Sequence, residues 1–280
     1  MRRRWLGLVA AALVLSGCDS EGGGGQSPAG APERVPAQFQ QLAGGAVASG
    51  ERLSRVLGCR GCHQDNLQGA DWFEDPSIGT LYSSNLTRAL VHYDDEQLKR
   101  AIQGGVRADG TPLWDMPSHI FSHLGDADMA ALISYLRTIP PAGEVHPPMS
   151  LTDKGRRLAA EWGFGPEPDK VREQASTWPP DVPGDHDWAR YMIRATCAEC
   201  HSLDLSGDPN PNAESAAPPL TIVSAYSRAQ FHHLLRTGEP VGDRRLGLMG
   251  QVARSRFNRL SDAEVNAIYD YLSAMAARAE

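Results

Sequence analysis

Apolar residues recur at helical spacing in three stretches of the first half of the chain, over residues 45–63, 94–103 and 126–136. In the first stretch they fall at Val47, Leu53 and Val56–Leu57, on one face of a helix. Asp94 or Asp95 precedes the second stretch as an N-terminal cap. No strand-like alternation of polar and apolar residues is visible over any length. The pattern therefore predicts an all-α fold.

The second half repeats this order of helical stretches. Helical patterns cover residues 186–201, 228–238 and 260–275. The closing stretches "LGDADMAALISYL" and "LSDAEVNAIYDYL" share Leu, Asp, Ala, an acid, Ala, Tyr and Leu in register. Ser261 and Glu264 form a capping box at the start of the second of these. Two copies of one helical domain account for the repeat.

Proline and glycine mark the boundaries of the two copies. Nine of the twenty prolines fall within residues 139–183, which indicates a connecting segment with at most one short helix over 151–162. The predicted domains are therefore residues 42–141 and 185–280, joined by a Pro-rich linker over residues 142–184.

The N-terminus reads as an export signal followed by a tether. Three arginines precede an apolar run that is too short to span a bilayer, so residues 1–17 are interpreted as a signal peptide. The run ends in "LSGC", which resembles a bacterial lipobox and predicts lipid on Cys18. The alternative is an ordinary signal peptide beside an unrelated cysteine. Residues 18–41, rich in Gly, Pro and Ala, are expected to be a flexible tether.

Composition and charge fit a folded, acidic protein. The 280 residues are 41% hydrophobic and 22% charged, within the range of globular chains. The net charge is −7, and it falls to −10 once the three arginines of the signal peptide are removed. This balance excludes a nucleic-acid partner, which requires a basic face, and favours protein partners with basic patches.

Two short motifs, "CRGCH" and "CAECH", carry the chemistry of the chain. Their residues are Cys59, Cys62 and His63 in the first copy and Cys197, Cys200 and His201 in the second. On a helix the spacing i, i+3, i+4 places all three side chains on one face. Two thiols one turn apart can form thioethers with the two vinyl groups of a haem, and the adjacent imidazole can bind the iron. The motifs predict two covalently attached haem c groups.

Other cysteine sites fit the sequence less well. Paired zinc-binding Cys-x-x-Cys motifs are about 15–20 residues apart, whereas 134 residues separate Cys62 from Cys197. A thioredoxin-like pair requires a βαβ setting and has no use for the histidine. Apart from Cys18, every cysteine of the chain lies in one of the two motifs, so none is left for a disulfide.

A second axial ligand decides what a haem can do. Methionine suits electron transfer, whereas an open position suits oxygen or peroxide chemistry. Met116 lies 53 residues after His63, and Met249 lies 48 residues after His201, in corresponding loops. These two methionines are the predicted distal ligands. The remaining candidates are expected to be packing, linker or surface residues: Met129, Met149, Met275, His119, His123, His232 and His233.

The stretches "CRGCHQDNLQGA", "AIQGGVRADGTPLWDMP" and "LGDADMAALISYLRTIPP" resemble class I c-type cytochromes. In particular they are similar to the multihaem cytochrome subunits of membrane-bound bacterial alcohol, aldehyde and sugar-acid dehydrogenases. The resemblance is strongest over residues 45–141. It implies that His63 and His201 are proximal ligands, that Met116 and Met249 are distal ligands, and that the stretch around Asn85 lies against the edge of the first haem.

Two features depart from those subunits: the chain has two haem motifs where they often carry three, and its predicted membrane anchor is an N-terminal lipid.

We expect a dihaem lipoprotein in the periplasm that transfers electrons from a dehydrogenase or quinol-linked donor to a cytochrome or terminal oxidase, without being an enzyme. The rival hypothesis is a dihaem cytochrome c peroxidase-like enzyme, in which one iron lacks a methionine. A haem-based sensor would need an output domain, and none is visible.

Overall fold

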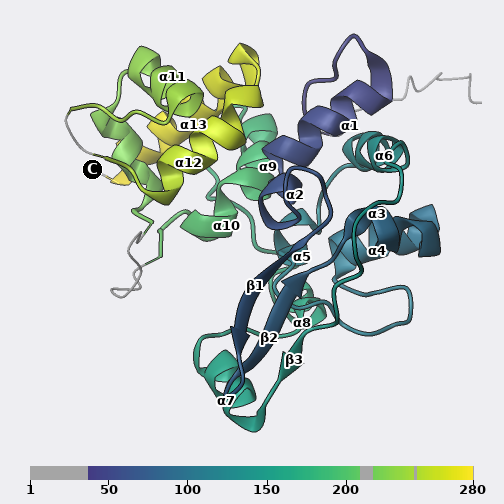
Figure 1. Ribbon diagram of the computed structural model, residues 1–280. Helices are drawn as coiled ribbons and strands as arrows, with labels where there is room; N and C mark the ends of the chain where they lie inside the picture. Colours follow the sequence, from purple (N-terminus) through teal and green to yellow (C-terminus); the bar gives the residue numbers. More distant parts are fainter. Residues whose placement is uncertain (1–36, 209–216, 243–244, 280) are drawn as a thin grey trace, which may run out of the picture. The chain divides into compact units, whose positions relative to one another are not determined.

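Helices make up most of the structure, and their order in the first half is repeated in the second (Figure 1). The computed structural model describes residues 37–208, 217–242 and 245–279. In the first half (37–184) the repeat consists of α1 (Gly45–Val56), α2 (Cys59–Cys62), α3 (Leu86–Ala89) with the 3-10 turn η1 (Leu90–His92), α4 (Asp95–Gly104), α5 (Ser118–Phe121) and α6 (Asp126–Leu136). In the second half (185–279) it consists of α9 (Asp187–Thr196), α10 (Ala198–His201), η2 (Leu220–Ala225), α11 (Arg228–Thr237), α12 (Leu248–Ser255), η3 (Phe257–Arg259) and α13 (Asp262–Ala279). The predicted fold class, two tandem all-α domains, is confirmed.

The predicted helix starts are confirmed at the level of hydrogen bonds. Asp94 accepts a hydrogen bond from the backbone N–H of Gln97, and the Gln97 side chain accepts one from the Asp94 backbone N–H. At α13 the backbone N–H of Ser261 donates to Glu264 at 2.7 Å, and the Glu264 N–H donates to Ser261 Oγ at 3.1 Å. These reciprocal bonds satisfy backbone donors that a helix N-terminus leaves without partners.

The first and last helices of each half cross each other. In the first half, a Cβ at Gly50 of α1 would lie 1.9 Å from the carbonyl oxygen of Ala131 in α6. Only glycine allows two helix backbones to approach this closely. Helices α9 and α13 pack together in the second half, as α1 and α6 do in the first.

A small antiparallel sheet extends from the first half, a feature that the apolar pattern did not indicate. It consists of β1 (Ala70–Asp75), β2 (Gly79–Ser83) and β3 (Ser150–Leu151), in the order β1-β2-β3. The four central residues of β1 are exposed, so neither of its faces needs an apolar set. The strands are also short, and the pairing of β1 with β2 is irregular between Asp71 and Phe73. Without a buried face there is no alternation to read.

The segment expected to be a linker is folded against the first half. Besides β3 it contains α7 (Asp153–Glu161) and α8 (Glu167–Glu173). The carboxylate of Glu167 is buried, accepts a hydrogen bond from His119 Nδ1 at 2.8 Å and pairs with Lys170 at 3.0 Å. Burial alone would raise the pKa of Glu167, but these two partners hold it below its usual value. Residues 142–184 are therefore packed against the first half.

The two halves share a buried polar network. Residues 36–280 form one compact unit, and the guanidinium of Arg52 in α1 makes a salt bridge of 2.7 Å with Glu264 in α13. Phe39, which we assigned to the tether, is fully buried, and its N–H donates to Asp128 at 2.8 Å. Tyr191 donates to the same carboxylate at 2.6 Å. Ordered chain thus begins before the expected Leu42.

Most of the predicted N-terminal segment lies outside the described residues. This applies to the signal peptide over 1–17, to Cys18 and to residues 19–36 of the tether. Within the described part of the chain, no helix combines the length and apolar character needed to cross a bilayer.

Candidate haem sites

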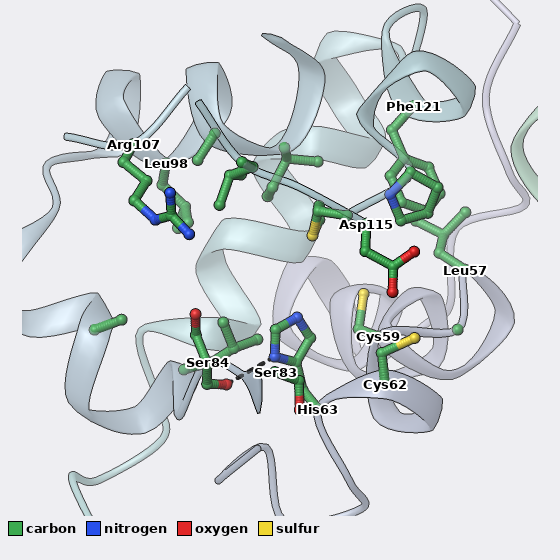
Figure 2. Close-up of a pocket in the computed structure, with 18 of the residues that line it drawn as sticks. Leu57, Cys59, Cys62, His63, Ser83, Ser84, Leu98, Arg107, Asp115 and Phe121 are labelled. Atoms are coloured by element: carbon green, nitrogen blue, oxygen red, sulfur yellow. Dashed lines mark hydrogen bonds between the residues drawn. The ribbon is translucent and has the colours of Figure 1, made fainter. Parts of the chain in front are cut away.

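Each half contains an apolar cavity into which its Cys-x-x-Cys-His motif opens. The first cavity is lined by the motif residues and Met116, and by apolar residues that include Leu98 and Phe121. Figure 2 shows the sulfur atoms of Cys59 and Cys62 directed into this cavity, with the imidazole of His63 beside them. The second cavity is lined by the equivalent set: Cys197, Cys200, His201, Met249, Phe231, Leu234 and Leu272.

Backbone carbonyls fix the orientation of both motif histidines. His63 Nδ1–H donates to the carbonyl of Ser84 at 2.8 Å (Figure 2). His201 Nδ1–H donates to the carbonyl of Pro218, also at 2.8 Å. Because Nδ1 carries the proton, Nε2 keeps its lone pair for a metal. Burial lowers the pKa of both histidines, against the effect of these hydrogen bonds, and so favours the neutral imidazole that metal binding requires.

The chain turns in the same way after each motif. The turn uses residues with positive φ at equivalent positions, namely Gln64 (65°) and Leu67 (59°) in the first copy and Ser202 (63°) and Leu205 (61°) in the second. It closes with an N–H of Gly69 donating to the His63 carbonyl, and an N–H of Gly207 donating to that of His201. Positive φ is uncommon outside glycine, so its recurrence shows that both motifs have the same local structure.

Met116 lies in a loop that is fastened to α4. The preceding residue, Asp115, has a φ of 61°, which turns the chain before the methionine. The N–H of Ser118 donates to the Met116 carbonyl at 2.6 Å, and Ser118 Oγ donates to Ala101 in α4 at 3.1 Å. These contacts place the Met116 side chain in the wall of the first cavity.

Met249 differs from Met116 in its setting. It lies in the first turn of α12, which begins at Leu248, and not in a loop as the sequence comparison of the two copies indicated. Its side chain nevertheless lines the second cavity together with His201. Each cavity therefore combines two cysteines, one oriented histidine and one methionine, all from the predicted set.

The remaining candidate residues lie elsewhere. Met129 is buried within α6, and Met275 is buried near the end of α13. His119 and His123 bond to Glu167 and to the Ala175 carbonyl, whereas His232 and His233 bond to Asn266 and Glu239. None of these residues lines either cavity.

The chemistry of these residues fits a covalently bound haem and does not fit a thiolate metal site. The four motif cysteines form no disulfide, and burial raises the pKa of Cys59 and of Cys197 to about 11. Both groups are therefore thiols at neutral pH. Over the described residues, no group of three or more His, Cys, Asp or Glu side chains is arranged to hold a metal ion. Two thiols, one imidazole and one thioether around an apolar cavity are the groups that hold haem c.

Three residues at the sites were not predicted from sequence. Arg107 lines the first cavity, and Trp72 of β1 lines it as well and donates its indole N–H to the Cys62 carbonyl at 3.3 Å. Arg256 lines the second cavity and pairs with Glu199 at 2.6 Å. Glu199 stands between the two cysteines of the second motif, but nothing near it in the sequence indicates a partner 57 residues away.

The stretch around Asn85, which the resemblance placed against the edge of the first haem, lines the first cavity through Ser83, Ser84 and Leu86. Asn85 itself has a different environment. Its side chain caps α3 and donates to the carbonyls of Ala142 and Glu144, both at 2.8 Å. It does not line the first cavity. The residue next to it, Ser84, is the one that contacts His63.

Comparison with known proteins agrees with this geometry. A family model described as Cytochrome c matches residues 47–140 and 189–276, more than half of the chain. Both matched segments contain one Cys-x-x-Cys-His motif and the methionine of the same cavity.

Several curated relatives align with most of the chain. The fructose dehydrogenase cytochrome subunit of Gluconobacter japonicus is 26% identical over 84% of this chain and 54% of the relative. The gluconate 2-dehydrogenase cytochrome c subunit of Pantoea cypripedii is 24% identical over 83% and 60%. This chain thus spans little more than half the length of either relative.

A third relative is matched over nearly its whole length. The diheme cytochrome c-type protein of Cereibacter sphaeroides is 24% identical over 86% of this chain and 90% of the relative. The chain therefore belongs to the cytochrome c family, with two tandem cytochrome c domains and two covalently bound c-type haems.

Proposed function

We propose that this chain is a dihaem electron carrier that accepts electrons from a dehydrogenase or quinol-linked donor and passes them to a cytochrome or terminal oxidase. One observation carries the proposal: both cavities contain a methionine as well as an oriented histidine. Ligation by both side chains would leave no open position for a substrate, and His/Met ligation raises the reduction potential. The haem would supply the redox change, and His63 with Met116, and His201 with Met249, would hold the iron in each cavity.

The names of the relatives support a dehydrogenase as the donor. Two of them are cytochrome subunits of fructose dehydrogenase and gluconate 2-dehydrogenase. The surface beside the first cavity suits protein contact, because Trp72 is 52% exposed there while also lining the cavity, and its neighbour Phe73 is exposed as well. Exposed aromatic side chains are enriched at protein interfaces.

Replacing each methionine tests the ligand assignment. Met116→Ala and Met249→Ala are each expected to lower the reduction potential of one haem and to let that haem bind carbon monoxide, because the distal position becomes open. Redox titration and carbon monoxide difference spectra measure both effects. Met129→Leu and Met275→Leu are matched controls, since both residues are buried in helices away from the cavities. They should leave potentials and spectra unchanged.

The same spectra distinguish a carrier from a peroxidase. If the unmodified protein is low-spin at both haems and ignores peroxide and carbon monoxide, the carrier proposal holds. If one haem of the unmodified protein binds either ligand, or is high-spin, then Met116 or Met249 is not a ligand and the peroxidase hypothesis replaces it.

We further propose that lipid on Cys18 tethers the protein to a membrane facing the periplasm. The support is the "LSGC" sequence after a short apolar run. Cys18→Ser is expected to move the protein from the membrane fraction to the soluble periplasmic fraction, since an acylated cysteine supplies the anchor. Fractionation with a haem stain measures this, and an unchanged membrane fraction would contradict the lipid.

A further inference from the structure

Arg256 lies between the two haem sites. Its side chain lines the second cavity, and its Nη1 pairs at 2.6 Å with Glu199 Oε2. Glu199 belongs to the motif of the second half, yet it lines the cavity of the first half. The wall of each site therefore includes one member of this ion pair.

The guanidinium of Arg256 rests on the backbone of the first motif. Gly58 and Gly61 flank Cys59, and a Cβ at Gly58 would lie 2.3 Å from Arg256 Cζ. A Cβ at Gly61 would lie 3.2 Å from Arg256 Nη2. Gly58 also has a φ of 82°, which disfavours any other residue. Because neither glycine has a side chain, the guanidinium of Arg256 can lie directly against the backbone of the motif.

The charges of Arg256 and Glu199 lie close to both motifs. Arg256 lies against Gly58 and Gly61 at the first motif and pairs with Glu199 of the second. Its side chain is only 15% exposed and that of Glu199 only 26%, so water screens these charges less than it would at the surface. A positive charge near an iron favours the reduced form, because reduction lowers the charge of the haem by one.

We propose that Arg256 and Glu199 position the two haem-attachment edges against each other and set the reduction potential of both haems together. Arg256 stabilises the reduced state of the haem at both sites, and Glu199 opposes this effect. Removing either charge therefore shifts the reduction potentials of both haems. The inference rests on the assignment of both motifs as haem sites.

Charge-removing variants with a matched control test this inference in the purified dihaem protein. Redox titration of Arg256→Gln is expected to lower the potentials of both haems, because Glu199 is left without its partner. Glu199→Gln is expected to raise both potentials, and the double variant should lie near the unmodified protein. The expected shift is roughly tenfold in each equilibrium constant for reduction, which is about 59 mV for a one-electron couple. Arg259→Gln removes the same charge from an exposed residue of η3 and should shift neither haem.

The signs of the shifts separate an electrostatic role from a structural one. If the pair only holds the halves together, both single variants loosen the interface and shift the potentials in the same direction, which would overturn the inference. Arg256→Lys keeps the charge and should retain most of the original potential. A shift confined to one haem would also overturn it. Haem content identifies the other failure: if the unmodified protein carries fewer than two attached haems, the site assignment itself is contradicted.

Discussion

Replacing Cys197 and Cys200 together with serine is expected to reduce the covalent haem content from two groups per chain to one. Serine cannot form the thioether bonds that hold the haem, whereas the first motif keeps Cys59 and Cys62 unchanged. The turn after each motif closes through its own local hydrogen bonds, so the first site retains its structure. Haem content per chain, measured by pyridine haemochrome absorbance after denaturation, checks the result.

The second half of this variant is also expected to lose much of its stability. Phe231, Leu234 and Leu272 line the second cavity, and without a covalently held haem their apolar surfaces lack a packing partner. Deleting a buried apolar group of even a leucine's size costs about 2–5 kcal/mol, and a haem is several times larger. Limited proteolysis should therefore cut within residues 185–279 first.

The reciprocal variant, with Cys59 and Cys62 replaced by serine, is the control for this result. It should also retain one haem, now in the second half, and become sensitive to proteolysis in the first. If either variant still carries two covalent haems, the attachment residues are wrong. If either carries none, the two attachments depend on each other.

The features that could be predicted from the sequence are those with local causes. The capping box at Ser261 and Glu264 and the cap at Asp94 involve residues three positions apart, and both are confirmed. The apolar faces of α1 and α13 follow from periodicity in the same way. The sheet could not be predicted, since β1 is largely exposed and shows no alternation.

Contacts between distant segments are the part of the fold that the sequence leaves open. Segment 142–184 is rich in proline, which indicates a linker, yet Glu167 fixes it to the first half through a hydrogen bond from His119, 48 residues away. Phe39 looks like an isolated apolar residue in a polar tether, but the second half supplies Tyr191 to pack against it, with ring centroids 5.7 Å apart. Neither partner can be inferred from neighbouring residues.

The candidate site shows the same division. The motif cysteines and histidines follow from a five-residue pattern, and the methionines follow from comparing the two copies. The carbonyls of Ser84 and Pro218 that orient the histidines are backbone atoms, so no side chain marks them. Arg256 is one of many arginines, and only the folded chain brings it to Glu199.

Replacing Arg52 with methionine is expected to lower the free energy of unfolding by about 3–5 kcal/mol, the usual cost of removing one partner from a buried ion pair. The Arg52 side chain is 8% exposed, and that of Glu264 is fully buried. The guanidinium binds both carboxylate oxygens, at 2.7 Å and 3.0 Å. Without it, the Glu264 carboxylate is left buried and without its compensating charge between the two halves. Urea unfolding followed by far-UV circular dichroism measures the change.

Two further variants test whether the buried charge is the cause. Arg55→Met, in the same helix, removes an arginine whose ion pairs with Glu51 and Asp65 lie nearer the surface, so it should cost at most about 1 kcal/mol. Combining Arg52→Met with Glu264→Gln removes the isolated charge while keeping a side chain that can still cap α13, and should recover part of the loss. A double variant less stable than Arg52→Met alone would contradict this explanation. In that case the two halves would be held together by hydrogen bonds from the backbone N–H groups of Gln40 and Ser261 to Glu264. The charge of Glu264 would not be the cause.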